Sequence, residues 1–293
     1  MTIHLKTLLG DHAVSAALKR GDIASDGVAF DIADVKVPNT AFRRVVRDLE
    51  FDVAELAIVT FLMAKDRGVP LTLLPVVLMA RAQHPFLVHD AMRGPLDPRQ
   101  LEGRRVGLRS WTVTTAVWLR QILADDYGVD ATRVSWVTCE DAHVAGAIDP
   151  PGVGRAPPGS DLLTMLHAGE IDAAIIGARP EDARIRPLIA DPVAAARAFQ
   201  QRTSAIQINH MVVVRQEIAD DQPALVREVL GLFRASHAAA TRAASCEAAG
   251  LPPFGIEANR RNLEVAIDAT YRQGLIARRF TVDELFCETV RAR

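Results

Sequence analysis

The feature that most constrains the fold of this chain is its alternation of short apolar runs with amphipathic stretches. Residues 2–8 alternate apolar and polar side chains, and residues 28–35 and 51–54 are again strand-like. Residues 13–19 and 60–65, which adjoin these strands, have the spacing of amphipathic helices. Strands that alternate with helices imply a largely parallel sheet. The chain is therefore predicted to be an α/β protein.

Later parts of the chain repeat this order and then become helical. Further strands are predicted over residues 71–79, 105–108, 134–138, 171–176 and 206–214. Helices are predicted over residues 112–126 and 161–167 and, after the last strand, over residues 223–244, 256–273 and 281–290. Asn39 and Ser160 are predicted to cap two of the helices. Two such strand–helix blocks with a helical tail predict two α/β lobes.

Charge and hydropathy exclude two classes of partner. The 34 Lys and Arg residues against 36 Asp and Glu residues give a formal net charge of −2, so the chain has no basic excess to neutralise nucleic-acid phosphates. The longest uncharged apolar run, residues 68–80, is interrupted by Pro70 and Pro75 and is shorter than the about 20 residues of a spanning helix. We therefore predict neither a nucleic-acid nor a membrane partner. A homo-oligomer stays possible.

The amino-terminal residues and the cysteines bear on location and cofactors. Residues 1–12 include Lys6 and Asp11 and lack the apolar core of a signal peptide, which predicts a cytoplasmic protein unless a leader has been removed. Cys139, Cys246 and Cys287 form no CxxC pair, so neither a zinc site nor a disulfide framework is predicted.

No motif for a metal or a nucleotide cofactor is present. Residues 139–143 hold Cys, Glu, Asp and His close together, but their spacing matches no metal-binding motif. A solvated loop or helix start is the preferred interpretation of that segment. The chain also lacks GxGxxG and Walker A patterns. We predict no cofactor and no metal.

Several segments resemble known proteins. Residues 51–56, 101–107 and 169–173 resemble the lobes of type II periplasmic-binding proteins. More narrowly, the chain resembles the 4,5-dihydroxyphthalate decarboxylase family, which uses that fold in cytoplasmic enzymes. This likeness covers nearly the whole chain, and it is carried by residues 114–120, 126–129, 209–215, 253–260, 273–275 and 282–286.

The resemblance implies a two-lobe, type II periplasmic-binding-protein-like architecture with a ligand cleft between the lobes. The first lobe is expected to comprise residues 1–84 and 212–293, and the second residues 85–211. Strands near residues 84–89 and 207–214 are expected to cross between them. Ligands of such sheets bind outside the carboxyl ends of the strands.

Three loops depart from the pattern of the family. Relatives tend to carry Pro-Glu-Tyr-Gln where this chain has residues 109–112, Arg-His-Ser where it has residues 83–85, and a Tyr-Asp-Arg run where it has residues 12–14. All three loops are expected to face the cleft. The scaffold is thus retained and the pocket is altered.

The loop after the strand at residues 105–108 is the predicted carboxylate-binding segment. Arg109 suits bidentate contact with a carboxylate, and Trp111 suits stacking on an aromatic ring. Ser110 and Thr112 either hydrogen-bond the ligand or cap the following helix. The alternative is a surface arginine and a core tryptophan. Arg81 and Arg179 are further candidate carboxylate ligands.

The equivalent loop of the first lobe holds Asp11 and His12. Asp11 either serves the site or merely caps the helix that follows, and His12 is a candidate proton donor. Glu55 lies in an apolar run, where a carboxylate is costly to bury unless it is paired. We expect Glu55 in the pocket, and Thr60 on the same wall.

Decarboxylation of a hydroxylated arene requires a general acid that protonates a ring carbon. The ring hydroxyl supplies electrons, so no organic cofactor is required. His210 and His84 are predicted on the two crossing segments, behind a bound ring. We predict His210 ahead of His84 as the proton donor, with Glu55 or Asp11 as its charge partner. The alternative is that each histidine is only a hydrogen-bonded structural group.

Three functions remain open. The leading hypothesis is a cofactor-independent carbon–carbon lyase that decarboxylates an aromatic polycarboxylic acid similar to 4,5-dihydroxyphthalate, in aromatic acid degradation. The second is a non-catalytic solute-binding protein for an aromatic acid or a similar small anion, and a secretory leader at the native gene start would favour it. The third is another enzyme on this scaffold, such as those of menaquinone synthesis, against which the carboxyl-terminal signature argues.

Overall fold

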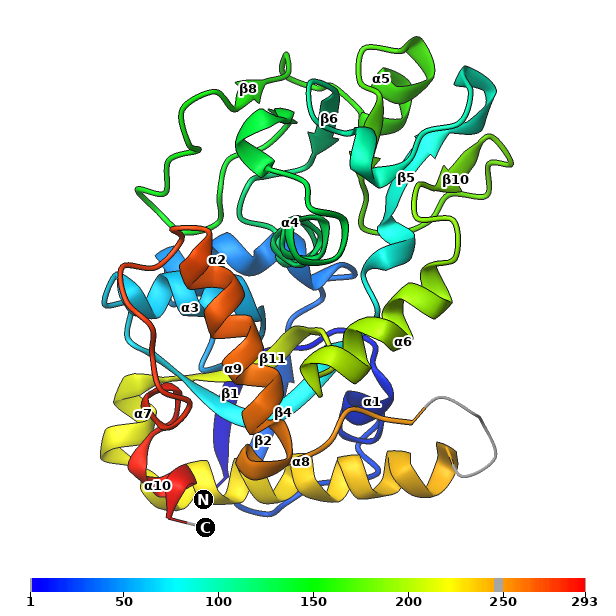
Figure 1. Ribbon diagram of the computed structural model, residues 1–293. Coiled ribbons are helices and arrows are strands. Elements are labelled where there is room, and N and C mark those ends of the chain that lie inside the picture. Colours follow the sequence, from blue (N-terminus) through cyan, green and yellow to red (C-terminus); the bar gives the residue numbers. More distant parts are fainter. Residues whose placement is uncertain (1, 245–249, 293) are drawn as a thin grey trace. The chain divides into compact units, whose positions relative to one another are not determined.

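The computed structural model describes residues 2–244 and 250–292, and the chain divides into two compact units (Figure 1). Unit 1 comprises Met1–Ala80 and Ile208–Arg293, and unit 2 comprises Arg81–Gln207. The chain therefore leaves unit 1 once and returns once, as a discontinuous domain does. The boundaries predicted from the sequence lie about four residues further along the chain in both cases. Cys246 lies outside the described residues.

Unit 1 is built on a mixed five-stranded sheet in the order β2-β1-β3-β11-β4. Its strands are β1 (Ile3–Leu8), β2 (Val28–Ile32), β3 (Val53–Ala57), β4 (Leu71–Ala80) and β11 (Ile208–Arg215). β1 pairs in parallel with β2 and β3, whereas β11 is antiparallel to β3 and β4. All five residues of β3 are buried, which explains its nearly continuous apolar sequence.

Seven α-helices of the described chain belong to unit 1. They are α1 (Ala13–Lys19), α2 (Phe42–Arg47), α3 (Ile58–Asp66), α7 (Gln216–Asp221), α8 (Pro223–Ala244), α9 (Ile256–Arg272) and α10 (Glu288–Arg291). α1 packs on α8 and α3 packs on α9. Two 3₁₀ helices, Pro38–Ala41 and Asp283–Leu285, complete the unit. α8 and α9 were predicted from their apolar faces, and these faces are buried in the contacts with α1 and α3.

Unit 2 is a six-stranded sheet in the order β10-β5-β9-β6-β7-β8. Its strands are β5 (Leu87–Asp90), β6 (Arg105–Leu108), β7 (Ser135–Thr138), β8 (Gly154–Arg155), β9 (Ala173–Ile175) and β10 (Ile185–Pro187). The helices are α4 (Thr114–Tyr127), α5 (Leu162–Ala168) and α6 (Pro192–Thr203), with 3₁₀ helices at His84–Phe86, Ala91–Arg93, Pro98–Gln100 and Ala131–Arg133. β5 runs antiparallel to its neighbours β9 and β10, and the other pairs are parallel.

The structure corrects three local predictions. Asn39 does not cap α2, because a 3₁₀ helix precedes that helix and Ala41 occupies the N-cap. Asp161 caps α5 in place of Ser160, and its side chain accepts from the backbone N–H of Thr164. The helix predicted over residues 281–290 is interrupted because Phe286 is extended and forms a β-bridge with Leu73.

Within the described residues no helix is long and apolar enough to cross a lipid bilayer.

Candidate active site

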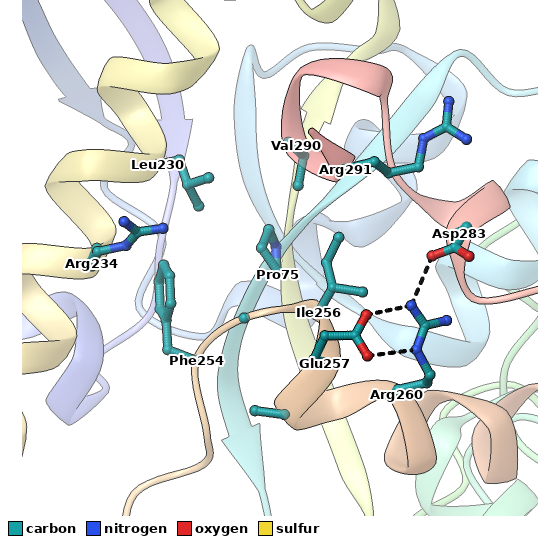
Figure 2. A pocket seen from close by; sticks show the side chains of 12 residues that line it. Pro75, Leu230, Arg234, Phe254, Ile256, Glu257, Arg260, Asp283, Val290 and Arg291 are labelled. Carbon is teal, nitrogen blue, oxygen red and sulfur yellow. Dashed lines mark hydrogen bonds and ion pairs between the residues drawn. The ribbon is translucent and has the colours of Figure 1, made fainter. Parts of the chain in front are cut away.

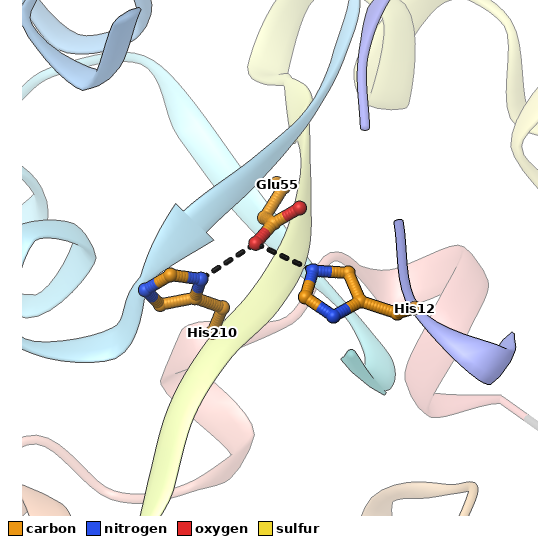
Figure 3. Close-up of side chains that lie close together, drawn as sticks. All are labelled: His12, Glu55 and His210. Carbon is orange, nitrogen blue, oxygen red and sulfur yellow. Dashed lines mark hydrogen bonds and ion pairs between the residues drawn. The ribbon is translucent and has the colours of Figure 1, made fainter. Parts of the chain in front are cut away.

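Unit 1 brings Glu55, His12 and His210 into direct contact (Figure 3). One carboxylate oxygen of Glu55, Oε1, lies 2.8 Å from His12 Nε2 and 2.5 Å from His210 Nδ1. The other oxygen, Oε2, accepts the backbone N–H of Gly10 at 2.8 Å. We refer to these three side chains as the His–Glu–His cluster. Glu55 is 1% exposed, and both of its oxygens are satisfied, as a buried carboxylate requires.

The sheet explains why these side chains meet. β1 and β3 are parallel neighbours, so the loop that follows β1 lies at the edge of the sheet where β3 also ends. β11 is the other neighbour of β3, with Val212 opposite Glu55 and His210 opposite Ala57. His210 and Glu55 are therefore diagonal neighbours on one face of the sheet. His12 enters from the loop, where it is the N-cap residue of α1.

Gly10 permits the close approach of the backbone to Glu55. A Cβ atom at this position would lie 2.8 Å from Glu55 Oε2 and 3.0 Å from His12 Nε2. Any larger residue would therefore push against two members of the cluster. The structure thus explains why a glycine occupies position 10, which the sequence alone did not show.

Electrostatic interactions keep the Glu55 carboxylate, at the centre of the cluster, ionised. Burial raises the pKa of Glu55, but the hydrogen bonds and charges of His12 and His210 outweigh it and lower the pKa to about 2. An ionised carboxylate accepts only, so both imidazoles donate to it. His210 then donates through Nδ1–H, so Nε2 is the ring nitrogen that does not contact Glu55.

Among the described residues, the His–Glu–His cluster is the group of side chains that could hold a metal ion. Its ligand atoms all lie within 4.8 Å of one another, and two imidazole nitrogens with one carboxylate oxygen suit an ion such as zinc. In the hydrogen-bonded arrangement, however, Glu55 Oε1 already accepts from both rings. Among the described residues, the segment 139–143 forms no such group.

Two other predicted residues of unit 1 do not join the cluster. The side chain of Asp11 is 90% exposed and forms an ion pair with Lys19. The hydrogen bond and charge of Lys19 lower the pKa of Asp11. The prediction that Asp11 caps α1 is wrong, because His12 is the N-cap residue. Thr60 is buried in α3.

The predicted carboxylate-binding segment lies between β6 and α4 of unit 2. Arg109 is partly exposed, and its Nη1 lies 3.6 Å from a carboxylate oxygen of Glu140. Ser110, Trp111 and Thr112 are buried. Neither Ser110 nor Thr112 caps α4, since Val113 is its N-cap residue.

Trp111 stacks on a residue that was not predicted from the sequence. The guanidinium of Arg120 lies 3.7 Å from the centroid of the Trp111 ring and donates to the Trp111 carbonyl at 2.9 Å. Arg120 is fully buried, and this burial lowers its pKa to about 9. The indole nitrogen of Trp111 is buried without a hydrogen-bond partner among the described residues. The Trp111 ring is therefore packed within unit 2, with Arg120 over its face and Trp136 edge-on at 5.8 Å.

His84 does not lie on a strand, contrary to the prediction. It begins the 3₁₀ helix His84–Phe86 and is 1% exposed, with its ring edge-on to Phe199. Neither ring nitrogen has a hydrogen-bond partner among the described residues. Burial, with the charge of Arg202, lowers the pKa of His84 to about 4. A neutral imidazole is a poor acid, which favours His210 over His84 as donor.

The two other predicted arginines differ in their surroundings. Arg81 donates to the carbonyl of Gly177 at 2.7 Å, and its guanidinium lies 3.8 Å from the centroid of the Phe86 ring. Arg179 is exposed, and no residue of the described chain pairs with it. Of these two arginines, Arg81 is thus held by contacts within the protein and Arg179 is exposed to solvent.

Replacing Arg109 with alanine is expected to weaken binding of an aromatic carboxylate by about 1.5–3 kcal/mol, the value of a hydrogen bond to a charged group. The physical reason is the loss of the Arg109 guanidinium, which lies at the first position of the loop before α4 and would pair with the carboxylate. Isothermal titration calorimetry with wild type and variant measures this difference, and Arg104→Ala on the same unit is a control. Unchanged affinity for every carboxylate tested would remove Arg109 from the site.

The fold places this chain in the class of periplasmic-binding-protein-like proteins. The sulphonate-binding protein SsuA from Escherichia coli superimposes with a TM-score of 0.57 over 100% of both chains, at 12% sequence identity. This likeness confirms the predicted two-lobe fold class.

Sequence comparison then identifies the family. A 4,5-dihydroxyphthalate decarboxylase from Comamonas testosteroni is 30% identical over 277 residues, which cover 89% of this chain and 83% of that protein. One from Pseudomonas putida is 26% identical over 225 residues, covering 69% of this chain and 83% of that protein. No profile of a known protein family matches. This chain belongs to the 4,5-dihydroxyphthalate decarboxylase family, which confirms the prediction of a decarboxylase, a carbon–carbon lyase.

Proposed function

We propose that this protein decarboxylates 4,5-dihydroxyphthalate, or a closely related hydroxylated aromatic polycarboxylic acid, without an organic cofactor or a metal. The contact between Glu55 and His210 carries the proposal, because it supplies a histidine held against a buried carboxylate at the end of a sheet. The relatives named above support the choice of substrate. The family likeness disfavours the alternative of a non-catalytic solute-binding protein.

The proposed reaction needs one proton and no redox partner. A ring hydroxyl para to the departing carboxylate pushes electrons toward the ring carbon, and that carbon takes a proton from His210 Nε2. The carbon–carbon bond then breaks, CO2 leaves, and its bonding electrons restore the aromatic ring. Solvent returns the proton to His210. The product is the corresponding dihydroxybenzoate.

Glu55 has two tasks in this mechanism. Its charge, 2.5 Å from His210 Nδ1, stabilises the imidazolium form that donates the proton. The same hydrogen bond also sets the orientation of the ring, and Nε2, the nitrogen that does not contact Glu55, is the atom that acts on the substrate. His12 donates to the same oxygen and thereby positions the carboxylate.

The proposal is tested by incubating the purified protein with 4,5-dihydroxyphthalate and measuring CO2 and dihydroxybenzoate. We expect the two products in equal amounts, and we expect dialysis against a chelator to leave turnover unchanged. Loss of turnover on chelation, restored by a divalent ion, would make the His–Glu–His cluster a metal site. Binding without CO2 release from any phthalate-type acid would establish the solute-binding alternative instead.

A further inference from the structure

Unit 1 contains a pocket whose lining includes no member of the His–Glu–His cluster (Figure 2). Its volume is about 640 Å³, which lies within the range of small-molecule sites. The pocket is bounded by β4, α8, the start of α9 and α10. β4 is the edge strand of the sheet, whereas Glu55 lies in the central strand β3. The pocket and the cluster are therefore two different places in unit 1.

One part of the wall of this pocket is apolar. Pro75, Leu230, Phe254, Ile256 and Val290 contribute to them. Phe254 is held in place because it lies next to Val76 in a β-bridge, and because the N–H of Gly255 donates to the Pro75 carbonyl at 3.0 Å. Gly255 has a φ of 107°, a conformation that glycine adopts readily. The aromatic ring of Phe254 is thus a fixed wall.

The charges of the pocket are unbalanced. Arg260 is neutralised within the protein, since it pairs with Glu257 at 2.5 Å and with Asp283 at 3.0 Å. Arg234 and Arg291 also line the pocket, and neither has an ion-pair partner among the described residues. The lining thus carries three arginines against two carboxylates, a net charge of +1, and its two guanidinium groups without an ion pair are those that can meet an anion.

The unpaired arginines lie beside apolar walls. The Arg234 guanidinium is 5.5 Å from the centroid of the Phe254 ring. In Figure 2, Arg234 and Phe254 lie on one side of the pocket and Arg291 on the other. A ligand with a flat apolar body and a carboxylate complements this arrangement, because the body covers Phe254 while the carboxylate meets a guanidinium fork.

We propose that this pocket is a second binding site, for an aromatic carboxylate. The ring of the ligand packs on Phe254 and the neighbouring aliphatic side chains, and its carboxylate pairs with Arg234. A second anionic group on the ligand pairs with Arg291. The ligand class follows from the lining of the pocket alone, so the inference does not rest on the proposed reaction.

The probe is phthalate, which combines an aromatic ring with two carboxylates. Hydrogen exchange is measured with and without saturating phthalate, in peptides that cover residues 251–260 and 286–291. We expect slower exchange in these peptides. The double variant Arg234→Gln/Arg291→Gln is expected to lose this protection and to bind about 10- to 100-fold more weakly at this site. Neutral phthalamide is expected to give no protection.

Arg227→Gln is the matched control, since Arg227 is exposed on α8 but does not line the pocket. It should keep the protection of wild type. Absence of protection in wild type, or its persistence in the double variant, would overturn the second site. Glu55→Gln separates the two proposals, because it should reduce CO2 release and leave protection at residues 251–260 intact.

Discussion

Replacing His210 with asparagine is expected to lower turnover of 4,5-dihydroxyphthalate by about 10²–10⁴-fold, with little change in substrate affinity. Asparagine retains part of the shape and hydrogen bonding of histidine, but it does not donate a proton as an acid. In the structure His210 Nδ1 is committed to Glu55, so the loss falls on the acid function of Nε2. Measuring kcat and KM from CO2 release separates this effect from a loss of binding.

The other histidines provide the comparison. His84→Asn alters a histidine whose pKa is lowered to about 4, and it should reduce turnover less than His210→Asn does. His12→Asn removes one of the two imidazoles on Glu55 but leaves His210 in place. Near-full turnover in His210→Asn would contradict the assignment. His12, the other imidazole on Glu55, would then be the next candidate for the donor.

Replacing Glu55 with glutamine is expected to reduce turnover and to change the acid stability of the protein. The pKa of Glu55 is lowered to about 2 from an ordinary value of 4.5. A lowered pKa means that the carboxylate contributes stability that is present above pH 4.5 and is lost as the pH falls toward 2. A shift of this size corresponds to about 3 kcal/mol.

Urea unfolding at a series of pH values measures this contribution. Between about pH 5 and pH 2, the free energy of unfolding of wild type should fall by about 3 kcal/mol more than that of Glu55→Gln. Asp11→Asn is the control, since Asp11 is exposed and outside the cluster. It should leave turnover unchanged. An Asp11→Asn variant that lowers turnover as strongly as Glu55→Gln would contradict the assignment of Glu55 as the only charge partner.

The sequence predicts an element well where a single local pattern decides the structure. β4 and α8 were expected over residues 71–79 and 223–244, and the structure has them at Leu71–Ala80 and Pro223–Ala244. The apolar run of β4 is buried on both faces of the strand, and the apolar stripe of α8 is buried on one face of the helix. The prediction of a helix over residues 281–290 was wrong because the structure of this segment depends on a residue far away in the chain. Phe286 pairs with Leu73, more than two hundred residues earlier in the chain, and no local pattern contains that partner.

The loop after β1 shows the limit at the candidate site. Asp11 and His12 are adjacent, and both residue types suit chemistry or capping. Which of them reaches Glu55 depends on the direction of each side chain as α1 begins. In the structure His12 is the N-cap residue and its ring turns to Glu55, while Asp11 meets Lys19 in solvent. Two adjacent residues therefore have different roles: His12 joins the cluster, and Asp11 forms a surface ion pair.

By itself the sequence determined the class of this protein. Strand–helix alternation specifies an α/β fold, and Glu55 in an apolar strand indicates that it has a partner, because an unpaired buried carboxylate is costly. Only the tertiary structure decided which partners these are. His12 and His210 lie 43 and 155 residues from Glu55 along the chain. Hydrogen bonds require approach to about 3 Å, and only the pairing of β3 with β1 and β11 brings such distant residues that close.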